Sequence, residues 1–400
     1  MTQPVLFVAA DLPWPPDGGG RIATLKVLEA LASERTVDLI ALSDAPDPDL
    51  TRLHEICRRV TVVSHPFTFG RHPVRQSATA LLAAVRRRAY RIEKFRSRTL
   101  SAMLHDAKRT ERYALIHHDQ FGVATYRDPA YPSTLTTQNV ESDIYRRGNA
   151  FANGFIRRAW AAREAAALRR AEPGAYLDFD HVFVLSDHDA GLLASIGVDR
   201  LSRLPIPMPV VGTVGEPPPR PIILSLGTMS WFGVEDGLLW FHREVLPIVR
   251  AAVPAAEWRL VGPNAGPAIR RLALDPGITV VGYVDDAEPE ILDARVAIVP
   301  LHVAGGIRIK LLQLMGMGRP SVSTSVGATG LDAADGDGCY VRDDPAGFAN
   351  AVISLLTDDH LWQVVARQGQ EHIKVGHSAA AMRDAVQAGL TAAIRHHAGG

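Results

Sequence analysis

Short apolar runs alternate with helical stretches along the whole chain, and this alternation limits the fold more than any other feature of the sequence. The runs expected to form strands are residues 5–9, 36–42, 60–63, 114–117, 133–137, 181–185, 201–206, 222–226, 258–261, 278–281, 296–300 and 321–323. The helical stretches between them include residues 21–33, 77–108 and 142–170, a helix after Ser186 and another from Ile307. Parallel strands need such crossovers, so the alternation predicts an α/β fold with parallel sheets.

A proline-rich segment divides the alternating series in two. Seven prolines lie between residues 205 and 221, and proline cannot sustain a helix. The chain has 400 residues, 47% of them apolar, which is enough for two ordinary cores. We therefore expect a first domain over residues 1–204, a linker over 205–220 and a second domain over 221–378. Residues 379–400 are expected to form a C-terminal helix, with a return to the first domain as one option.

Charge and cysteine content exclude several classes of protein. The 43 Lys and Arg residues balance 43 Asp and Glu residues, which argues against a general nucleic-acid binder. Cys57 and Cys339 lie far apart and indicate neither a disulfide framework nor a zinc site. The N-terminus lacks a signal-peptide pattern, and no apolar run approaches the roughly 20 residues of a membrane span. We expect a cytoplasmic protein.

A glycine pair at the start of a helix is the clearest functional pattern. Gly305 and Gly306 follow the strand expected over residues 296–300, and Arg308 and Lys310 come in the next turn. Glycine lets backbone N–H groups approach an anion, and a helix N-terminus adds unpaired donors and partial positive charge. A basic first turn opposes the helix dipole, which favours a bound diphosphate. A crossover helix with a solvated basic turn is the alternative.

Candidate residues of the first domain also follow expected strands, where ligands of doubly wound sheets bind. Gly18, Gly19 and Gly20 open the first helix and could admit an acceptor or a sugar phosphate, or form only a tight turn. His117 and His118 end a strand. Because adjacent strand side chains face opposite ways, only one of them can point toward a ligand, and both could be ordinary strand-end residues.

Two polar residues come directly after the strand expected over residues 133–137. The amide of Gln138 can form hydrogen bonds but cannot act as an acid or a base. Glu141 could accept hydrogen bonds from acceptor hydroxyls, or it could be only a favourable charge at a helix start. In the second domain, Gly227 and Thr228 occupy the corresponding place after the first strand.

These segments together resemble the retaining glycosyltransferases of the GT-B fold, particularly the large family usually numbered four. Residues 305–322 are similar to the family's donor-site signature, and further similar segments are residues 15–21, 138–141, 184–186, 226–231, 261–263 and 281–286. The resemblance spans nearly the whole chain. It implies two Rossmann-like domains facing a central cleft, with the acceptor bound by the first domain and a nucleotide sugar by the second.

The resemblance also implies roles for single residues. His118, Arg308 and Lys310 would be catalytic, with the histidine touching the donor sugar. The donor would be bound by Gly227, Thr228, Tyr283, Val284, Gly305, Gly306 and Gln313. The acceptor or a sugar phosphate would be bound by Gly18, Gly19, Gly20, Gln138 and Glu141. The sequence departs from the family at Gly305 and Gln313, which stand in place of paired glutamates, and at Gln138, which replaces a histidine.

The expected activity is transfer of a sugar from a nucleotide-diphosphate donor to a hydroxyl acceptor, with retention of the anomeric configuration. No metal and no cofactor other than the donor is expected. The acceptor could be a small molecule, a glycan or a lipid-linked compound. Two alternatives remain. One is a catalytically inactive nucleotide-sugar-binding protein, which the departures from the family favour, and the other is a nucleotide-sugar epimerase on the same fold.

A strongly basic segment lies in the expected acceptor domain. Residues 71–112 contain twelve Lys and Arg against three Asp and Glu, most densely at Arg86, Arg87 and Arg88. Such a segment could dock on an anionic membrane surface or on a phosphorylated acceptor, whereas a solvated arginine-rich helix is the alternative. Peripheral contact with the inner face of the membrane through this segment is therefore one expectation.

Overall fold

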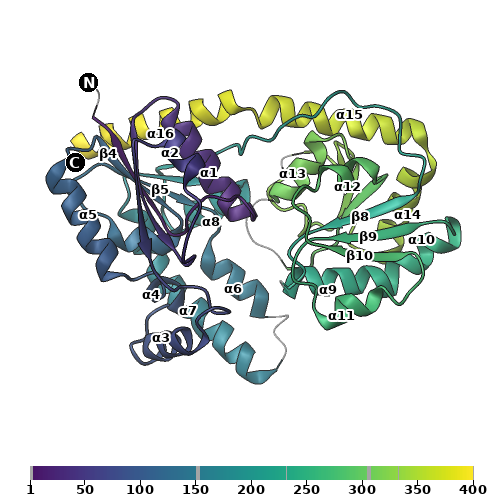
Figure 1. The fold of residues 1–400 in the computed structure, drawn as a ribbon, viewed down its shortest axis with the longest axis horizontal. Coiled ribbons are helices and arrows are strands. Elements are labelled where there is room, and N and C mark those ends of the chain that lie inside the picture. The colour runs from purple at the N-terminus through teal and green to yellow at the C-terminus, as the bar shows by residue number, and fades with distance from the viewer. Residues whose placement is uncertain (1–2, 150–153, 231, 304–307, 332, 400) are drawn as a thin grey trace. The chain divides into compact units, whose positions relative to one another are not determined.

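The computed structural model describes residues 3–149, 154–230, 232–303, 308–331 and 333–399 (Figure 1). Internal contacts divide the chain into two units. The first comprises residues 1–206 together with 379–400, and the second comprises residues 207–378. No helix in the described ranges is long and apolar enough to cross a membrane.

The first unit is built on a seven-stranded sheet in the order β3-β2-β1-β4-β5-β6-β7, with every pairing parallel. Its strands are β1 (Val5–Ala9), β2 (Val37–Ser43), β3 (Arg59–Ser64), β4 (Leu115–Asp119), β5 (Ser133–Thr137), β6 (His181–Val184) and β7 (Leu201–Arg203). Its helices are α1 (Gly19–Ala32), α2 (Thr51–Ile56), α3 (Pro73–Val85), α4 (Tyr90–Glu93), α5 (Arg98–Thr110), the 3₁₀ turn η1 (Phe121–Tyr126), α6 (Glu141–Asn149), α7 (Phe155–Leu177), α8 (Asp187–Ser195) and α16 (Ala379–Gly399).

The second unit contains a six-stranded parallel sheet in the order β10-β9-β8-β11-β12-β13. Its strands are β8 (Ile222–Leu226), β9 (Glu257–Val261), β10 (Ile278–Gly282), β11 (Val296–Val299), β12 (Ser321–Ser323) and β13 (Cys339–Val341). Its helices are α9 (Phe232–Trp240), the π turn η2 (Phe241–Val245), α10 (Leu246–Ala252), α11 (Pro267–Leu272), α12 (Glu288–Asp293), α13 (Ile309–Gly316), α14 (Pro345–Thr357) and α15 (Asp359–Gly376).

Helices cover both faces of each sheet (Figure 1), so the central strands are buried on both sides. In each unit the strand order reverses beside the first strand, because β1 lies between β2 and β4 while β8 lies between β9 and β11. In doubly wound sheets ligands bind outside the carboxyl ends of the strands at this reversal. The predicted α/β fold with two Rossmann-like domains is confirmed, and each unit offers one such edge.

Two predicted helical stretches are divided in the structure. The stretch expected over residues 77–108 is the three helices α3, α4 and α5. Arg87 takes a left-handed backbone conformation with φ of 54°, and Ser97 caps α5 by accepting a hydrogen bond from Leu100 N–H at 3.2 Å. The helix expected over residues 142–170 is α6 and α7. Strand β13 was not predicted, since it has only three residues and follows two glycines with positive φ, Gly336 and Gly338.

The proline-rich segment contains neither a helix nor a strand, and its first part is bound to the second unit. Met208 N–H donates to the carbonyl of His377 at 3.1 Å, and Val211 N–H donates to the carbonyl of Gly316 at 3.1 Å. The amide of Gln370 donates to the Val211 carbonyl at 3.2 Å. Residues 208–211 are therefore packed as part of a domain.

Candidate functional site

Two glycines bring the loops after β8 and β9 into close contact. Gly227 N–H donates to the Val261 carbonyl at 3.0 Å. A Cβ atom added to Gly262 would lie 1.9 Å from the Gly227 carbonyl oxygen, and Gly262 has φ of 141°. A side chain at Gly262 would therefore collide with backbone and strain its own conformation. The predicted donor residue Gly227 lies buried at this junction, with Thr228 exposed beside it.

Lys310 places its ammonium group at the same junction. Its Nζ atom lies 3.8 Å from the position of a Cβ on Gly227. The side chain is half-buried, and burial lowers the pKa of Lys310. Among the described residues, the ammonium group has no hydrogen-bond or ion-pair partner. Because a desolvated and unpaired cation is costly, an anion bound at this point would stabilise the site.

Helix α13 holds Lys310 through its apolar face. Leu311, Leu312, Leu314 and Met315 are all at most 1% exposed. Arg308 is half-buried at the N-cap of the helix, directly before its first turn. The side chain of Gln313, three residues after Lys310, is also half-buried. The predicted residues Gly305 and Gly306 lie outside the described residues.

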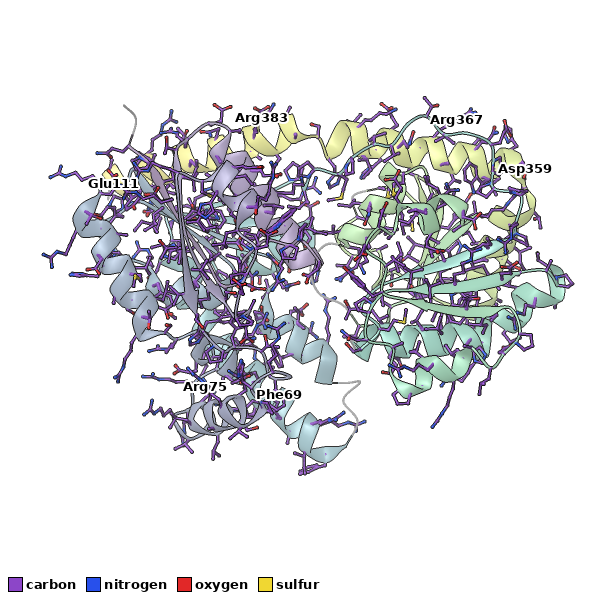
Figure 2. All side chains as sticks on the ribbon, in the orientation of Figure 1. Phe69, Arg75, Glu111, Asp359, Arg367 and Arg383 are labelled. Carbon is purple, nitrogen blue, oxygen red and sulfur yellow. The ribbon has the colours of Figure 1, made fainter. Side chains whose placement is uncertain are left out.

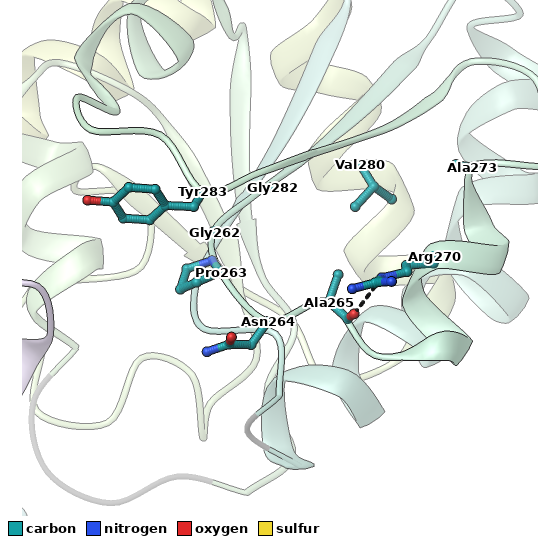
Figure 3. A pocket seen from close by; sticks show the side chains of 9 residues that line it. All are labelled: Gly262, Pro263, Asn264, Ala265, Arg270, Ala273, Val280, Gly282 and Tyr283. Atoms are coloured by element: carbon teal, nitrogen blue, oxygen red, sulfur yellow. Dashed lines mark hydrogen bonds between the residues drawn. The ribbon is translucent and has the colours of Figure 1, made fainter. Parts of the chain in front are cut away.

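A hollow of about 560 Å³ opens beside the Gly262 loop, at the ends of β9 and β10 (Figure 3). It is lined by Gly262, Pro263, Asn264, Ala265, Arg270, Ala273, Val280, Gly282 and Tyr283. The ring of Tyr283 is 65% exposed, whereas Val284 is half-buried and packs against an apolar cluster beneath the strand ends. Tyr283 therefore lines the hollow with a largely exposed ring, whereas Val284 belongs to the apolar packing.

A hydrogen-bonded pair that the sequence did not reveal lies after β11. His302 contacts Asp236 of α9 through Nδ1 at 3.0 Å, and its ring stands edge-on to Trp240 at 5.0 Å. In the sequence, this pair could have been suspected only from His302, which comes shortly after an apolar strand. In the described ranges, no group of three His, Cys, Asp or Glu side chains could hold a metal ion.

The carboxyl edge of the first sheet brings several predicted acceptor residues together. Gln138 donates from Nε2 to the Gly20 carbonyl at 3.0 Å and to the Thr24 hydroxyl at 3.1 Å. The Thr24 hydroxyl in turn donates to Asp119 Oδ2 at 2.6 Å. Gly18 precedes α1 and Gly19 begins it. One hydrogen-bond network therefore joins the glycine turn to Gln138 and, through Thr24, to Asp119.

Asp119 is a residue of this network that sequence reasoning did not select. Its side chain is fully buried, and its Oδ1 atom has no hydrogen-bond partner within the described part of the chain. Burial raises the pKa of Asp119 to about 7, although the Thr24 hydroxyl acts in the opposite direction. A carboxyl group with such a pKa exchanges protons near neutral pH.

Both strand-end histidines are fully buried on opposite faces of the sheet. His117 packs between Phe7 and Phe183 and contacts the Thr134 hydroxyl at 2.8 Å. His118 packs edge-on against Phe179 with ring centroids 5.2 Å apart. Burial lowers the pKa of His117 to about 3 and that of His118 to about 4. The catalytic role of His118 stays a prediction, and its surroundings are those of a packed core residue.

Glu141 is placed in an ion pair rather than at an open surface. It is 8% exposed and accepts a hydrogen bond from Arg91 at 3.0 Å. Nearby, the Lys94 ammonium lies over the Phe95 ring at 4.6 Å, and burial lowers the pKa of Lys94 to about 7. A basic group that titrates near neutral pH therefore adjoins Glu141.

Comparisons with known proteins show a similar fold and one matching family model. Residues 220–358 match the family model "Glycosyl transferases group 1". Sucrose-phosphate synthase from Thermosynechococcus elongatus superimposes with a TM-score of 0.68 at 16% identity, covering 95% of this chain and 96% of that one. HepE from Anabaena, in complex with UDP and glucose, gives a TM-score of 0.65 at 13% identity, covering 97% and 99%.

WaaG, a glycosyltransferase involved in lipopolysaccharide biosynthesis, gives a TM-score of 0.62 at 13% identity and covers 96% of this chain and 98% of that one. The comparison with curated protein sequences finds no match. The family match lies in the second unit, which contains β8, Gly227 and Lys310. The chain therefore has the GT-B fold, and its resemblance to the group 1 glycosyltransferases is confirmed.

Proposed function

We propose that the protein transfers a sugar from a nucleotide-diphosphate donor to a hydroxyl acceptor, with retention of the anomeric configuration. One observation carries the proposal. The half-buried Lys310 ammonium has no anionic partner among the described residues and lies beside Gly227 at the carboxyl edge of the sheet. This is an arrangement suited to a diphosphate, since it combines a cation with backbone N–H donors of a helix start.

The proposed chemistry uses these donors on the leaving group. When the bond between the sugar and the diphosphate breaks, negative charge grows on the departing diphosphate. Lys310, Arg308 and the first N–H groups of α13 would stabilise that charge more strongly in the transition state than in the ground state. No metal and no cofactor besides the donor is required by this scheme.

We assign the rest of the donor to the hollow beside Gly262 and Tyr283. The volume of about 560 Å³ is of the size of small-molecule sites. HepE, which has the same fold, is in complex with UDP and glucose, and this supports a nucleotide sugar as the donor class. The acceptor is assigned to the edge of the first sheet around Gly20 and Gln138.

Two other functions are compatible with the same site. One is a nucleotide-sugar-binding protein without catalysis. This function is favoured because Gly305, Gln313 and Gln138 stand where the family that this chain resembles has two glutamates and a histidine. A nucleotide-sugar epimerase would alter the free donor without any acceptor. Incubation with donor alone, and then with donor and acceptor panels, separates the three by their products.

Binding of the nucleotide is the first test of the site. We expect Lys310→Ala to weaken binding of the preferred nucleoside diphosphate about 10- to 100-fold, because a hydrogen bond to a charged group contributes about 1.5–3 kcal/mol. Calorimetry with UDP, GDP, ADP and dTDP at fixed salt measures this. Lys374→Ala is the matched control, since Lys374 is an exposed lysine of the same unit.

The outcomes are distinct. Selective binding that is lost in Lys310→Ala and kept in Lys374→Ala supports the diphosphate site and names the base. Equal affinities of wild type and Lys310→Ala would contradict the assignment of the diphosphate to this residue. Binding without turnover or epimerisation across broad panels would favour the non-catalytic alternative.

A further inference from the structure

Helix α3 turns its apolar side chains toward solvent. Val74, Leu81, Leu82 and Val85 are 84%, 67%, 48% and 74% exposed, and they recur at the i, i+7, i+8 and i+11 spacing of one helix face. The opposite face buries Gln76, whose amide oxygen accepts a hydrogen bond from the Tyr90 hydroxyl at 2.8 Å. The amphipathic pattern is thus the reverse of that of an ordinary surface helix, which buries its apolar face.

A second exposed apolar group lies at the start of α7. Phe155 and Ile156 are 86% and 83% exposed. Two turns later, Arg163 of the same helix donates to the Ala83 carbonyl of α3 at 2.7 Å, which fixes the two helices to one another. The apolar residues of both helices therefore belong to the same part of the first unit.

Basic side chains surround these apolar residues. Arg71, Arg75, Arg86, Arg87, Arg88 and Arg157 are exposed. No Asp or Glu occurs over residues 66–92, and the first acidic residue of α7 is Glu164, which is fully buried. Figure 2 shows Phe69, 55% exposed, and Arg75 on this part of the first unit. We name the set of α3, the start of α7 and these arginines the α3–α7 surface.

We propose that the α3–α7 surface docks on an anionic lipid bilayer. Apolar side chains on a helix with basic neighbours insert at the boundary between headgroups and acyl chains, while the arginines attract anionic headgroups. A second copy of the chain fits less well, because two surfaces of the same positive sign repel each other. The proposal goes beyond the proposed function, because it concerns where the protein works, and it holds whether or not sugar transfer is found.

Vesicle flotation with the full chain tests the proposal. Wild type is mixed with vesicles of phosphatidylcholine alone or with added phosphatidylglycerol, at low and at high NaCl. We expect binding to the anionic vesicles that weakens with salt. The apolar variant Leu81→Ser/Val85→Ser and the basic variant Arg75→Ala/Arg86→Ala should each reduce partitioning by about tenfold or more.

Matched controls come from the second unit. Leu274→Ser removes a side chain that is 83% exposed, and Arg271→Ala removes an exposed arginine, both away from the α3–α7 surface. These variants should bind vesicles like wild type. Because all altered side chains are exposed, unchanged circular dichroism and melting temperature are expected for each variant.

The proposal would be overturned by equal partitioning of wild type and both surface variants, or by binding that ignores lipid charge. It would also be overturned if wild type fails to bind vesicles and instead forms dimers that Leu81→Ser/Val85→Ser abolishes in light scattering. Neither result bears on nucleotide binding at Lys310, so the two proposals fail independently.

Discussion

Buried ionisable side chains govern how the first unit responds to acid. Burial lowers the pKa of His117 to about 3 and the pKa values of His118 and His181 to about 4, against 6.5 for a solvated histidine. Between these values the unfolded chain binds protons that the folded chain does not bind. These three histidines therefore make stability fall as pH decreases from 6.5 toward 4, whereas Asp119, whose pKa is raised to about 7, acts in the opposite direction.

Replacing one of these histidines should reduce the acid sensitivity. We expect His118→Phe to lose less stability than wild type between pH 6.5 and pH 4, because one group that protonates only on unfolding is removed while an aromatic ring still faces Phe179. Denaturant unfolding across this pH range measures the difference. His105→Phe, which alters an exposed histidine of α5, is the control. An unchanged pH slope in His118→Phe would contradict this reading.

The same variant bears on the catalytic prediction for His118. The ring is fully buried in the core of the first unit. Measuring both the stability and the turnover of His118→Phe therefore separates the contribution of this residue to folding from its contribution to catalysis. Strand alternation correctly indicated that His117 and His118 face opposite ways. It could not indicate that Phe7, Phe179 and Phe183 enclose both rings, because those contacts join residues far apart in the sequence.

Close backbone contacts position the elements around the carboxyl edge of the second sheet. A Cβ atom on Gly237, in the middle of α9, would lie 1.8 Å from the Pro300 carbonyl oxygen after β11. We expect Gly237→Ala to lower the free energy of unfolding by about 1–3 kcal/mol, because the helix must move away from the strand. Chemical denaturation of the variant measures the loss.

A helical glycine with free space around it provides the comparison. Gly191 lies in α8, and a Cβ there would meet no atom within 4 Å. Gly191→Ala should therefore leave stability unchanged or raise it by about 0.5–1 kcal/mol through the better helix propensity of alanine. Similar losses in both variants would show that propensity or the unfolded state, rather than the contact with Pro300, sets the effect.

Element type was more predictable than element extent. Strands β5, β8 and β12 have the predicted bounds, and each follows directly on a proline that marks its start. The break at Arg87 was not predictable, because no glycine or proline marks it. At the carboxyl edge of the second sheet, the rule that ligands bind outside strand ends pointed to both Gly227 and Lys310, which lie close together in the structure. The His302–Asp236 pair depends on how α9 packs, and the sequence pattern does not show this.

The last helix completes the first unit, although the whole second unit separates it from the rest of that unit in the sequence. Helix α16 contacts α1, β5, β6 and β7, and it buries Met382, Val386, Leu390 and Ala393. A Cβ on Gly389 would lie 2.3 Å from the Phe183 ring of β6. His396 contacts Asp180 Oδ1 at 2.9 Å directly before the same strand. The stability of the first sheet therefore depends on residues beyond 378.

A chain ending at Ser378 should lose stability in the first unit and keep it in the second. Burial of three large apolar side chains of α16 contributes roughly 5 kcal/mol, which is a large part of the stability of a typical domain. Hydrogen exchange by mass spectrometry should show faster exchange in β5 and β6 and unchanged exchange in β8 and β9. In the full chain, Gly389→Ala should also lower the stability of the first unit, because the added Cβ would collide with Phe183. Gly376→Ala is the control and should leave that stability unchanged, because no atom lies within 4 Å of its added Cβ. Equal protection of β5 and β6 from hydrogen exchange with and without α16 would contradict this expectation. It would mean that the first sheet is stable without this helix, and that α16 packs on the first unit without being a necessary part of its core.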